Sequence, residues 1–280
     1  MNTHYLHQKR LLQDRLFTLL CALAVLLGLS VIAAVLWTLI SKGYSHVDLL
    51  LFTELTPGPN MAGGLLNAFV GSLIMPGLAL LISAPIAVLI AIYLVESPST
   101  HRLARYVRFF NDVLLSAPSI IVGLFIYIMV VRTMGHFSAM AGALSLAVIA
   151  LPMIVRASED VISLSAQPLR EAVMALGAPR WAFVWLVLAH AARSGIITAL
   201  LLAFARVLGE TAPLLFTALN SSFLVTNLWQ PMANLPVVIY QFAMSPYDNW
   251  QGLAWAGALM LTIVILVINL LARLIGMQKS

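Results

Sequence analysis

The chain has 280 residues, of which 62% are hydrophobic and only 9% are charged, and its formal net charge is +5 at pH 7. A soluble domain carries roughly a quarter charged residues, so this composition excludes a water-soluble globule and indicates that lipid is the main solvent. In lipid, only helices and closed barrels satisfy every backbone N–H and C=O group. The apolar stretches are long and do not alternate with polar residues, which favours helices.

Long apolar stretches predict six membrane-spanning helices in an all-α transmembrane bundle. Their expected ranges, in chain order, are 16–40, 70–94, 113–131, 137–155, 195–219 and 251–272. The first stretch has 25 residues and is therefore longer than the h-region of a signal peptide, so we expect it to remain in the protein. The fifth span is expected to start after Arg193, because an arginine deep in lipid costs about 2.5 to 3.5 kcal/mol. The single cysteine, Cys21, excludes a disulfide within one chain.

Basic residues are distributed unevenly between the two sides of this topology. Twelve lysines and arginines fall on the side of both termini, whereas only Lys42 and Arg132 fall on the other side. Loops rich in Lys and Arg remain in the cytoplasm, so both termini are expected there. The expected organisation is a cytoplasmic tail at 1–15, a transmembrane domain at 16–275 and a cytoplasmic tail at 276–280. The positive charge thus follows the topology and does not indicate a nucleic-acid partner.

The connection between the fourth and fifth spans, near 156–193, contains the amphipathic segment R-E-A-V-M-A-L-G-A-P-R-W-A-F-V at 170–184. Gly177 and Pro179 are expected to end or turn its helix. A helix of this length is marginal in water, so something must hold it. Two interpretations remain open, namely a helix lying on the membrane surface and a helix docked onto a partner protein.

The same segment resembles the EAA loop of ABC importer permeases. Glu171, Ala172 and Gly177 stand at the matching positions of the pattern E-A-A-x-x-x-G. In that family the loop inserts into a groove on a cytoplasmic ATPase, which implies an ATPase-coupling role for these three residues. The chain contains no G-x-x-x-x-G-K-[ST] phosphate loop. We therefore expect no cofactor on this chain and ATP hydrolysis on a partner subunit.

Two ionisable residues, Arg206 and Glu210, are expected in the middle of the fifth span. They are four residues apart, so on a helix they share a face and can pair. Ionisable residues inside a membrane are costly and commonly mark a transport pathway, although an ion pair that fixes helix packing is the alternative. The planar guanidinium of Arg206 suits phosphate, and Glu210 would weaken the attraction so that the anion can be released.

Six motifs in order resemble the PstA family of phosphate-transport (Pst) permeases, which is part of the ABC importer permeases. They are L-F-T-E-L-T-P-G-P-N at 51–60, L-L-S-A-P-S-I-I-V-G-L-F at 114–125, G-E-T-A-P-L-L-F-T-A at 209–218, Q-P-M-A-N-L-P at 230–236, F-A-M-S-P at 242–246 and L-A-W-A-G at 253–257. The resemblance implies a six-span bundle of the type I ABC importer permease kind. It also implies a multi-pass protein of the bacterial plasma (inner) membrane that forms the phosphate path of an ATP-driven importer.

The resemblance further implies residue roles and partners. Arg206 and Arg156 match arginines that the family uses in phosphate translocation, and Glu210 matches the acidic partner. Arg156 has an alternative interpretation, since an arginine at a cytoplasmic helix end commonly extends to the interface. The implied partners are a homologous permease (PstC), an ATPase dimer (PstB), an extracytoplasmic phosphate-binding protein (PstS), the lipid bilayer and inorganic phosphate.

Other functions are less well supported by the sequence. A secondary anion transporter would show paired broken helices in two related halves, and only one half here carries the Arg–Glu pair. A channel would need a selectivity ring. A membrane enzyme would need a catalytic cluster, and no His, Cys, Asp and Glu set converges in the sequence, so we expect a transport subunit with no catalytic residues and no metal site. Import of an oxyanion other than phosphate remains an alternative.

Overall fold

The computed structural model describes residues 3–97, 101–177, 179, 183 and 189–277, and all regular elements within these ranges are helical. The helices are α1 (Thr3–Gly43), η1 (Tyr44–His46), α2 (Leu50–Thr53), α3 (Leu66–Glu96), α4 (Arg102–Ser116), α5 (Ser119–Ile126), η2 (Tyr127–Val131), α6 (Arg132–Met134), α7 (Ala139–Ala175), α9 (Ala189–Leu208), α10 (Ala212–Leu215), α11 (Leu235–Ala243) and α12 (Asp248–Met277). Among these, five helices are long and apolar enough to cross a membrane, and one bent pair is a sixth candidate span. The predicted all-α transmembrane fold is confirmed.

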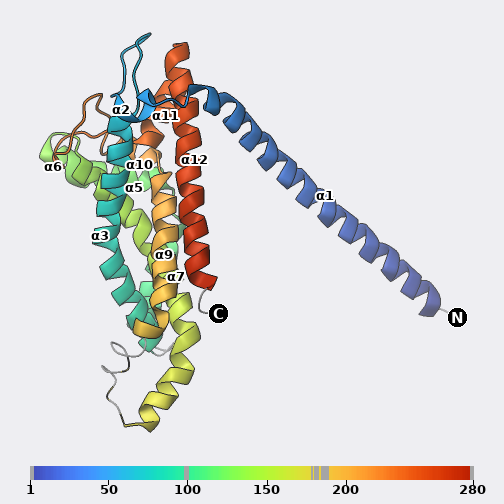
Figure 1. The fold of residues 1–280 in the computed structure, drawn as a ribbon. Coiled ribbons are helices and arrows are strands. Elements are labelled where there is room, and N and C mark those ends of the chain that lie inside the picture. The colour runs from blue at the N-terminus through green and yellow to red at the C-terminus, as the bar shows by residue number, and fades with distance from the viewer. Residues whose placement is uncertain (1–2, 98–100, 178, 180–182, 184–188, 278–280) are drawn as a thin grey trace.

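The bundle core forms where α3 and α7 pack along each other, with α9 covering both (Figure 1). Met75 of α3 and Leu146 and Ile154 of α7 are fully buried in this interface. Small residues allow the helix backbones to approach closely. A Cβ on Gly142, for example, would lie 2.9 Å from the sulfur of Met75.

Helix α1 projects away from the bundle (Figure 1). No residue of its most apolar 18-residue window is buried. Its C-terminal end is anchored on α12, because a Cβ on Gly43 would lie 2.9 Å from the Leu259 Cβ, and the Lys42 ammonium lies 5.0 Å from the centroid of the Trp255 ring. The remainder of α1 therefore presents an apolar surface that none of the described residues covers.

Three predicted spans agree closely with single helices. The predicted spans 16–40, 70–94 and 251–272 lie within α1, α3 and α12, each of which extends a few residues further. Helix α1 extends furthest, since it begins at Thr3 in the stretch that was expected to be a tail. Pro76 and Pro85 both lie inside α3 without ending it.

The prediction of one continuous third span at 113–131 is wrong. The chain turns by 102° between α4 and the helical stretch from Ser119 to Met134. Ala117 and Pro118 are both extended at the turn, with ψ near 131°. A proline disfavours helical conformation in the residue before it and lacks the N–H that would continue the helix, which explains the break at this position.

The fourth and fifth spans also differ from their predicted bounds. Helix α7 begins near the expected residue 137 but continues to Ala175, so residues 170–175 of the amphipathic segment form the end of a long helix. Helix α9 ends at Leu208, whereas the span was expected to reach 219. The reason is Pro213, whose ring would clash with the Gly209 carbonyl four residues earlier if the helix continued.

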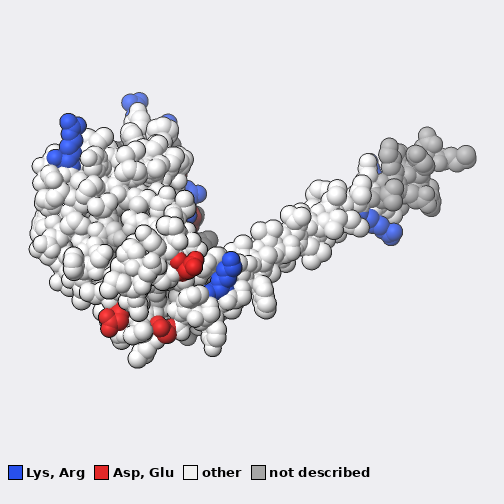
Figure 2. Space-filling model, turned by 90° about the horizontal axis from the view of Figure 1, so that it is seen from above, with Lys and Arg blue, Asp and Glu red and all other residues white. Residues whose placement is uncertain are grey.

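Side-chain amides connect the loops at the end of the bundle that carries α2 and α11. Asn67 is buried and accepts hydrogen bonds from the Thr56 N–H and hydroxyl at 3.2 and 2.7 Å, while its amide donates to the Ser221 carbonyl at 2.7 Å. Figure 2 looks onto this end and shows a mostly uncharged surface with a few separated charged side chains. Hydrogen bonds of buried amides therefore help to hold these loops together, in addition to the apolar cluster around Leu51 and Leu65.

Candidate functional site

A cavity of about 370 Å³ lies beside the turn between α4 and α5. Its described lining residues come from four helices and the turn between two of them: Leu114, Leu115, Ala117, Pro118, Ser119, Val122, Ile149, Met153 and Arg206. Arg206 is the only charged residue in this set. A guanidinium against apolar walls is screened less than in water, so the cavity favours an anion.

Two interrupted helices meet next to this cavity. Helix α5 packs on α10, the short helix that follows the interruption after α9. The contact is closest at Gly123, where a Cβ would lie 2.6 Å from the Cα of Pro213. Discontinuous helices whose breaks face each other are a known way to build a transport site inside a membrane. The break at Pro118 lines the cavity directly, and Arg206 lies three residues before the break at Gly209.

Arg206 and Glu210 form the ion pair that the sequence predicts, with 3.6 Å between Arg206 Nη2 and Glu210 Oε1. They lie at the C-terminal end of α9 and just beyond it, and not in the middle of a span as expected. The Arg206 side chain is 59% exposed, whereas that of Glu210 is 13% exposed. The guanidinium is therefore available to a second anion while its carboxylate partner is largely covered.

Arg156 lies within α7, which continues beyond it to Ala175. It is three residues after Met153 and seven after Ile149, which places all three on one face of the helix. It does not line the cavity, and it pairs with Asp160 at 3.6 Å on an exposed surface. Arg156 thus lies about 4.5 Å further along α7 than Met153, beyond the lining of the cavity.

The three residues of the predicted coupling segment lie at the end of α7. Glu171 is exposed, and Ala172 is helical, although its side chain lies outside the described set. Gly177 has a φ of +73° and follows the end of the helix at Ala175, so the predicted turn is present. Residues 178, 180–182 and 184 of the segment 170–184 lie outside the described residues.

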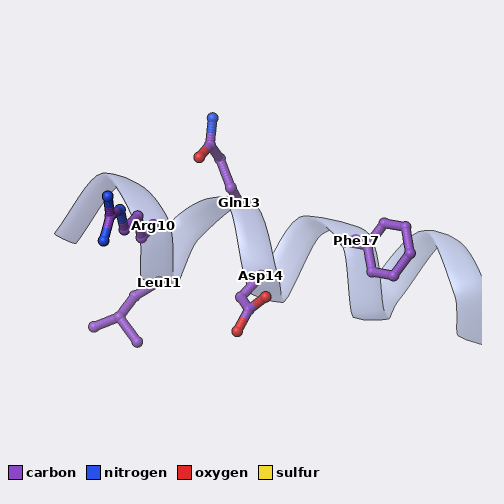
Figure 3. A pocket seen from close by; sticks show the side chains of 5 residues that line it. All are labelled: Arg10, Leu11, Gln13, Asp14 and Phe17. Carbon is purple, nitrogen blue, oxygen red and sulfur yellow. The ribbon is translucent and has the colours of Figure 1, made fainter. Parts of the chain in front are cut away.

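A second hollow lies on α1 and is not a candidate site. Arg10, Leu11, Gln13, Asp14 and Phe17 line it, and Figure 3 shows these side chains on successive turns of α1. All five are exposed and come from the same helix. A ligand there would remain in contact with solvent or lipid instead of being enclosed by the protein.

Several polar contacts were missed from the sequence because the partners are far apart in the chain. Arg108 pairs with Glu159, and Arg170 pairs with Glu96. The apolar lining of the cavity was missed as well. The motif at 114–125 does contain Pro118, and the sequence signal for a proline between two apolar runs could have located the break.

Comparison with known proteins identifies related chains over most of the length. Residues 83–277 match the family described as binding-protein-dependent transport system inner membrane component. The chain is 47% identical to the phosphate transport system permease protein PstA of Pasteurella multocida, over 100% of this chain and 99% of the relative. It is 48% identical to the PstA protein of Xylella fastidiosa strain Temecula1, over 99% and 96% of the two chains.

The fold resembles a solved structure of the same general kind. A chain of the MetNI methionine ABC transporter, in inward-facing conformations, superposes with a TM-score of 0.60 at 20% sequence identity. The superposition covers 76% of this chain and 93% of the other. At this identity the similarity concerns the arrangement of helices alone.

Proposed function

Because the chain belongs to the family of binding-protein-dependent transport system inner membrane components, we propose that it is the membrane-spanning permease subunit of an ATP-driven phosphate importer. The observation that carries the substrate assignment is Arg206, the one charged residue among the described residues that line the cavity beside the α4–α5 turn. Its planar fork can donate two parallel hydrogen bonds to a phosphate. The near full-length similarity to PstA permeases supports the same substrate.

Release of phosphate is as important as its capture. The carboxylate of Glu210, 3.6 Å from the guanidinium, competes with the incoming anion and keeps the attraction moderate. Arg156 lies further along the α7 face and provides a second cationic position toward the coupling end of that helix. Phosphate passes from Arg206 to Arg156, and each arginine carries a carboxylate partner that helps to displace it.

The ATPase docks on the coupling segment. Glu171, Ala172 and Gly177 lie where α7 leaves the bundle, and the left-handed turn at Gly177 reverses the chain there. ATP is bound and hydrolysed on that partner, an ATPase dimer of the PstB type, and this chain acts as a transport subunit. The basic residues of the coupling side place both termini in the cytoplasm.

The remaining partners occupy the exposed apolar and outer surfaces. A homologous permease of the PstC type covers the exposed side of α1 and closes the second wall of the path. A phosphate-binding protein of the PstS type delivers phosphate at the opposite end of the bundle, where hydrogen bonds of Asn67 hold the loops in place. The chain is accordingly a multi-pass protein of the inner membrane.

Uptake of labelled phosphate into proteoliposomes tests this function. The chain is assembled with the second permease, the ATPase and the binding protein, and uptake is measured with and without ATP. We expect ATP-dependent phosphate uptake that Arg206→Gln lowers at least about tenfold, since a hydrogen bond to a charged group contributes about 1.5 to 3 kcal/mol. Arg132→Gln, which removes an exposed arginine at the outer end, is the matched control and should transport normally.

The alternative substrates are separated in the same assay. Excess sulfate or molybdate should not reduce phosphate uptake. Uptake of one of these anions in preference to phosphate would assign the importer to another oxyanion, and uptake that persists without ATP would indicate a secondary transporter.

A further inference from the structure

A set of polar contacts outside the cavity joins the C-terminal end of α3 to α4 and α7. Arg108 of α4 donates from Nε to Glu159 Oε1 of α7 at 2.8 Å and from Nη2 to the Leu94 carbonyl of α3 at 2.7 Å. The Arg108 side chain is 32% exposed and that of Glu159 is 14% exposed, so solvent screens this contact only in part. One guanidinium thus holds three helices together.

The carbonyl of Leu94 needs such a donor. The residue four positions later is Pro98, which has no N–H and therefore cannot complete the helical hydrogen bond. Arg108 supplies the missing donor and also places a positive charge at the C-terminal end of α3, where the helix dipole favours it. A lysine ammonium is a single point and cannot reproduce the fork that reaches both acceptors.

Helix α4 carries a second connection to α7 on the same face. Asn111, three residues after Arg108, is buried and donates from Nδ2 to the Pro152 carbonyl at 3.2 Å. Immediately beyond it, Leu114 and Leu115 already line the cavity. A displacement of α7 relative to α3 is therefore carried by α4 to the turn at the cavity.

The coupling segment is tied to the same end of α3. Arg170, which directly precedes Glu171, forms an ion pair with Glu96, the last residue of α3. Its guanidinium also lies 5.7 Å from the centroid of the buried Phe183 ring. The segment that meets the ATPase and the Arg108 contacts thus converge on the last turn of α3, between Leu94 and Glu96.

We propose that Arg108 is a positioning residue that transmits the movement of the coupling segment to the α4–α5 turn at the cavity. The proposal rests on the proposed function. When the ATPase moves the end of α7, the contacts of Arg108 with Glu159 and Leu94 make α4 follow, and the position of Pro118 relative to Arg206 changes. Without Arg108, ATP hydrolysis continues, but the position of Pro118 relative to Arg206 no longer changes with it.

The first test measures phosphate uptake and ATP hydrolysis in the same proteoliposomes. Arg108→Gln should lower uptake at least tenfold while ATP hydrolysis stays within twofold of the parent, so that many more ATP molecules are consumed per phosphate. Arg108→Lys should show the same uncoupling to a smaller degree. Arg105→Gln, which alters an exposed arginine on the same helix, is the matched control and should remain coupled. A parallel loss of uptake and hydrolysis in Arg108→Gln, or no change in either, would overturn the proposal.

The second test does not depend on the transported substrate. Cys21→Ser removes the single cysteine, and Ser116→Cys then places one thiol in an exposed position at the end of α4. The rate at which a maleimide labels this thiol should change when ATP and vanadate trap the complex, and Arg108→Gln should abolish that change. A retained change in the Arg108→Gln background would refute the transmission, even if phosphate proved to be the wrong substrate.

A third test distinguishes a role of Arg108 in coupling from a role in assembly of the complex. The double variant Arg108→Glu with Glu159→Arg restores the ion pair but not the hydrogen bond to Leu94, and it should assemble and regain part of the coupling. If this variant and Arg108→Lys both fail to co-purify with the ATPase, Arg108 serves assembly and the proposal is wrong.

Discussion

Gly123 of α5 and Pro213 of α10 lie in direct backbone contact, and a Cβ on the glycine would come within 2.6 Å of the proline Cα. Each residue belongs to a helical stretch that follows an interruption, so their contact fixes how α5 and α10 pack on each other. A side chain at Gly123 cannot be accommodated without moving α10.

Gly123→Ala should therefore destabilise the protein by about 1 to 3 kcal/mol and reduce transport, because the added methyl group forces the backbones apart. The thermal midpoint in detergent and phosphate uptake measure the two effects. Gly77→Ala is the control, since its Cβ would meet nothing within 4 Å and alanine favours a helix interior by about 0.5 to 1 kcal/mol. An equal loss of stability in both variants would contradict the close contact.

The Arg206–Glu210 pair permits a test that separates transport from packing. If Arg206 binds phosphate, Arg206→Lys should retain part of the uptake, and the double variant Arg206→Gln with Glu210→Gln should remain inactive although it assembles. If the pair only fixes helix packing, the double variant removes both charges and should transport normally. The measurement is phosphate uptake divided by the amount of assembled complex.

The left-handed turn at Gly177 should matter for ATPase docking. Gly177 has φ +73° and Gly135 has φ +77°, and a Cβ at either position would meet nothing within 4 Å. Alanine at each position pays a similar backbone cost of about 1 to 2 kcal/mol. Gly177→Ala should reduce co-purification of the ATPase, whereas Gly135→Ala, outside the coupling segment, should leave it unchanged. Equal docking by the two variants would contradict the coupling role of this turn.

Asn67 should stabilise the loops at the end of the bundle that carries α2 and α11. Asn67→Leu leaves the Thr56 N–H and the Ser221 carbonyl without their partner and should lower stability by about 1 to 3 kcal/mol. Thermal unfolding in detergent and limited proteolysis of the loops report the change. Asn227→Ala, which removes an exposed local bond to the Trp229 N–H, should alter stability by less than about 0.5 kcal/mol.

The orientation of the chain is testable with reporter fusions. A fusion after Gly177 should report the cytoplasm, and one after Ser222 should report the outside, because twelve of the basic residues lie on the side of the coupling segment. The opposite result at either position would require a different number of spans.

Much of the membrane fold follows from the sequence alone. The spans at 16–40, 70–94 and 251–272 are predictable from the sequence. The length of an apolar stretch is a local property, and it decides whether a helix can cross the hydrocarbon core. The Arg206–Glu210 pair is also local, since a spacing of four residues brings the side chains together wherever the helix lies. Gly177 and Pro179 likewise predicted the end of a helix, and α7 ends at Ala175.

The tertiary structure decided where these local features meet. Hydropathy alone predicts continuous helices at Pro118 and Pro213, because the residues on both sides of each break are equally apolar. The structure shows that the helices are interrupted there. The cavity needs α4, α5, α7 and α9 at once, and Arg108 needs the carbonyl of Leu94 and the carboxylate of Glu159. Such contacts depend on packing between segments that are distant in the chain, which hydrophobic length and helical spacing do not specify.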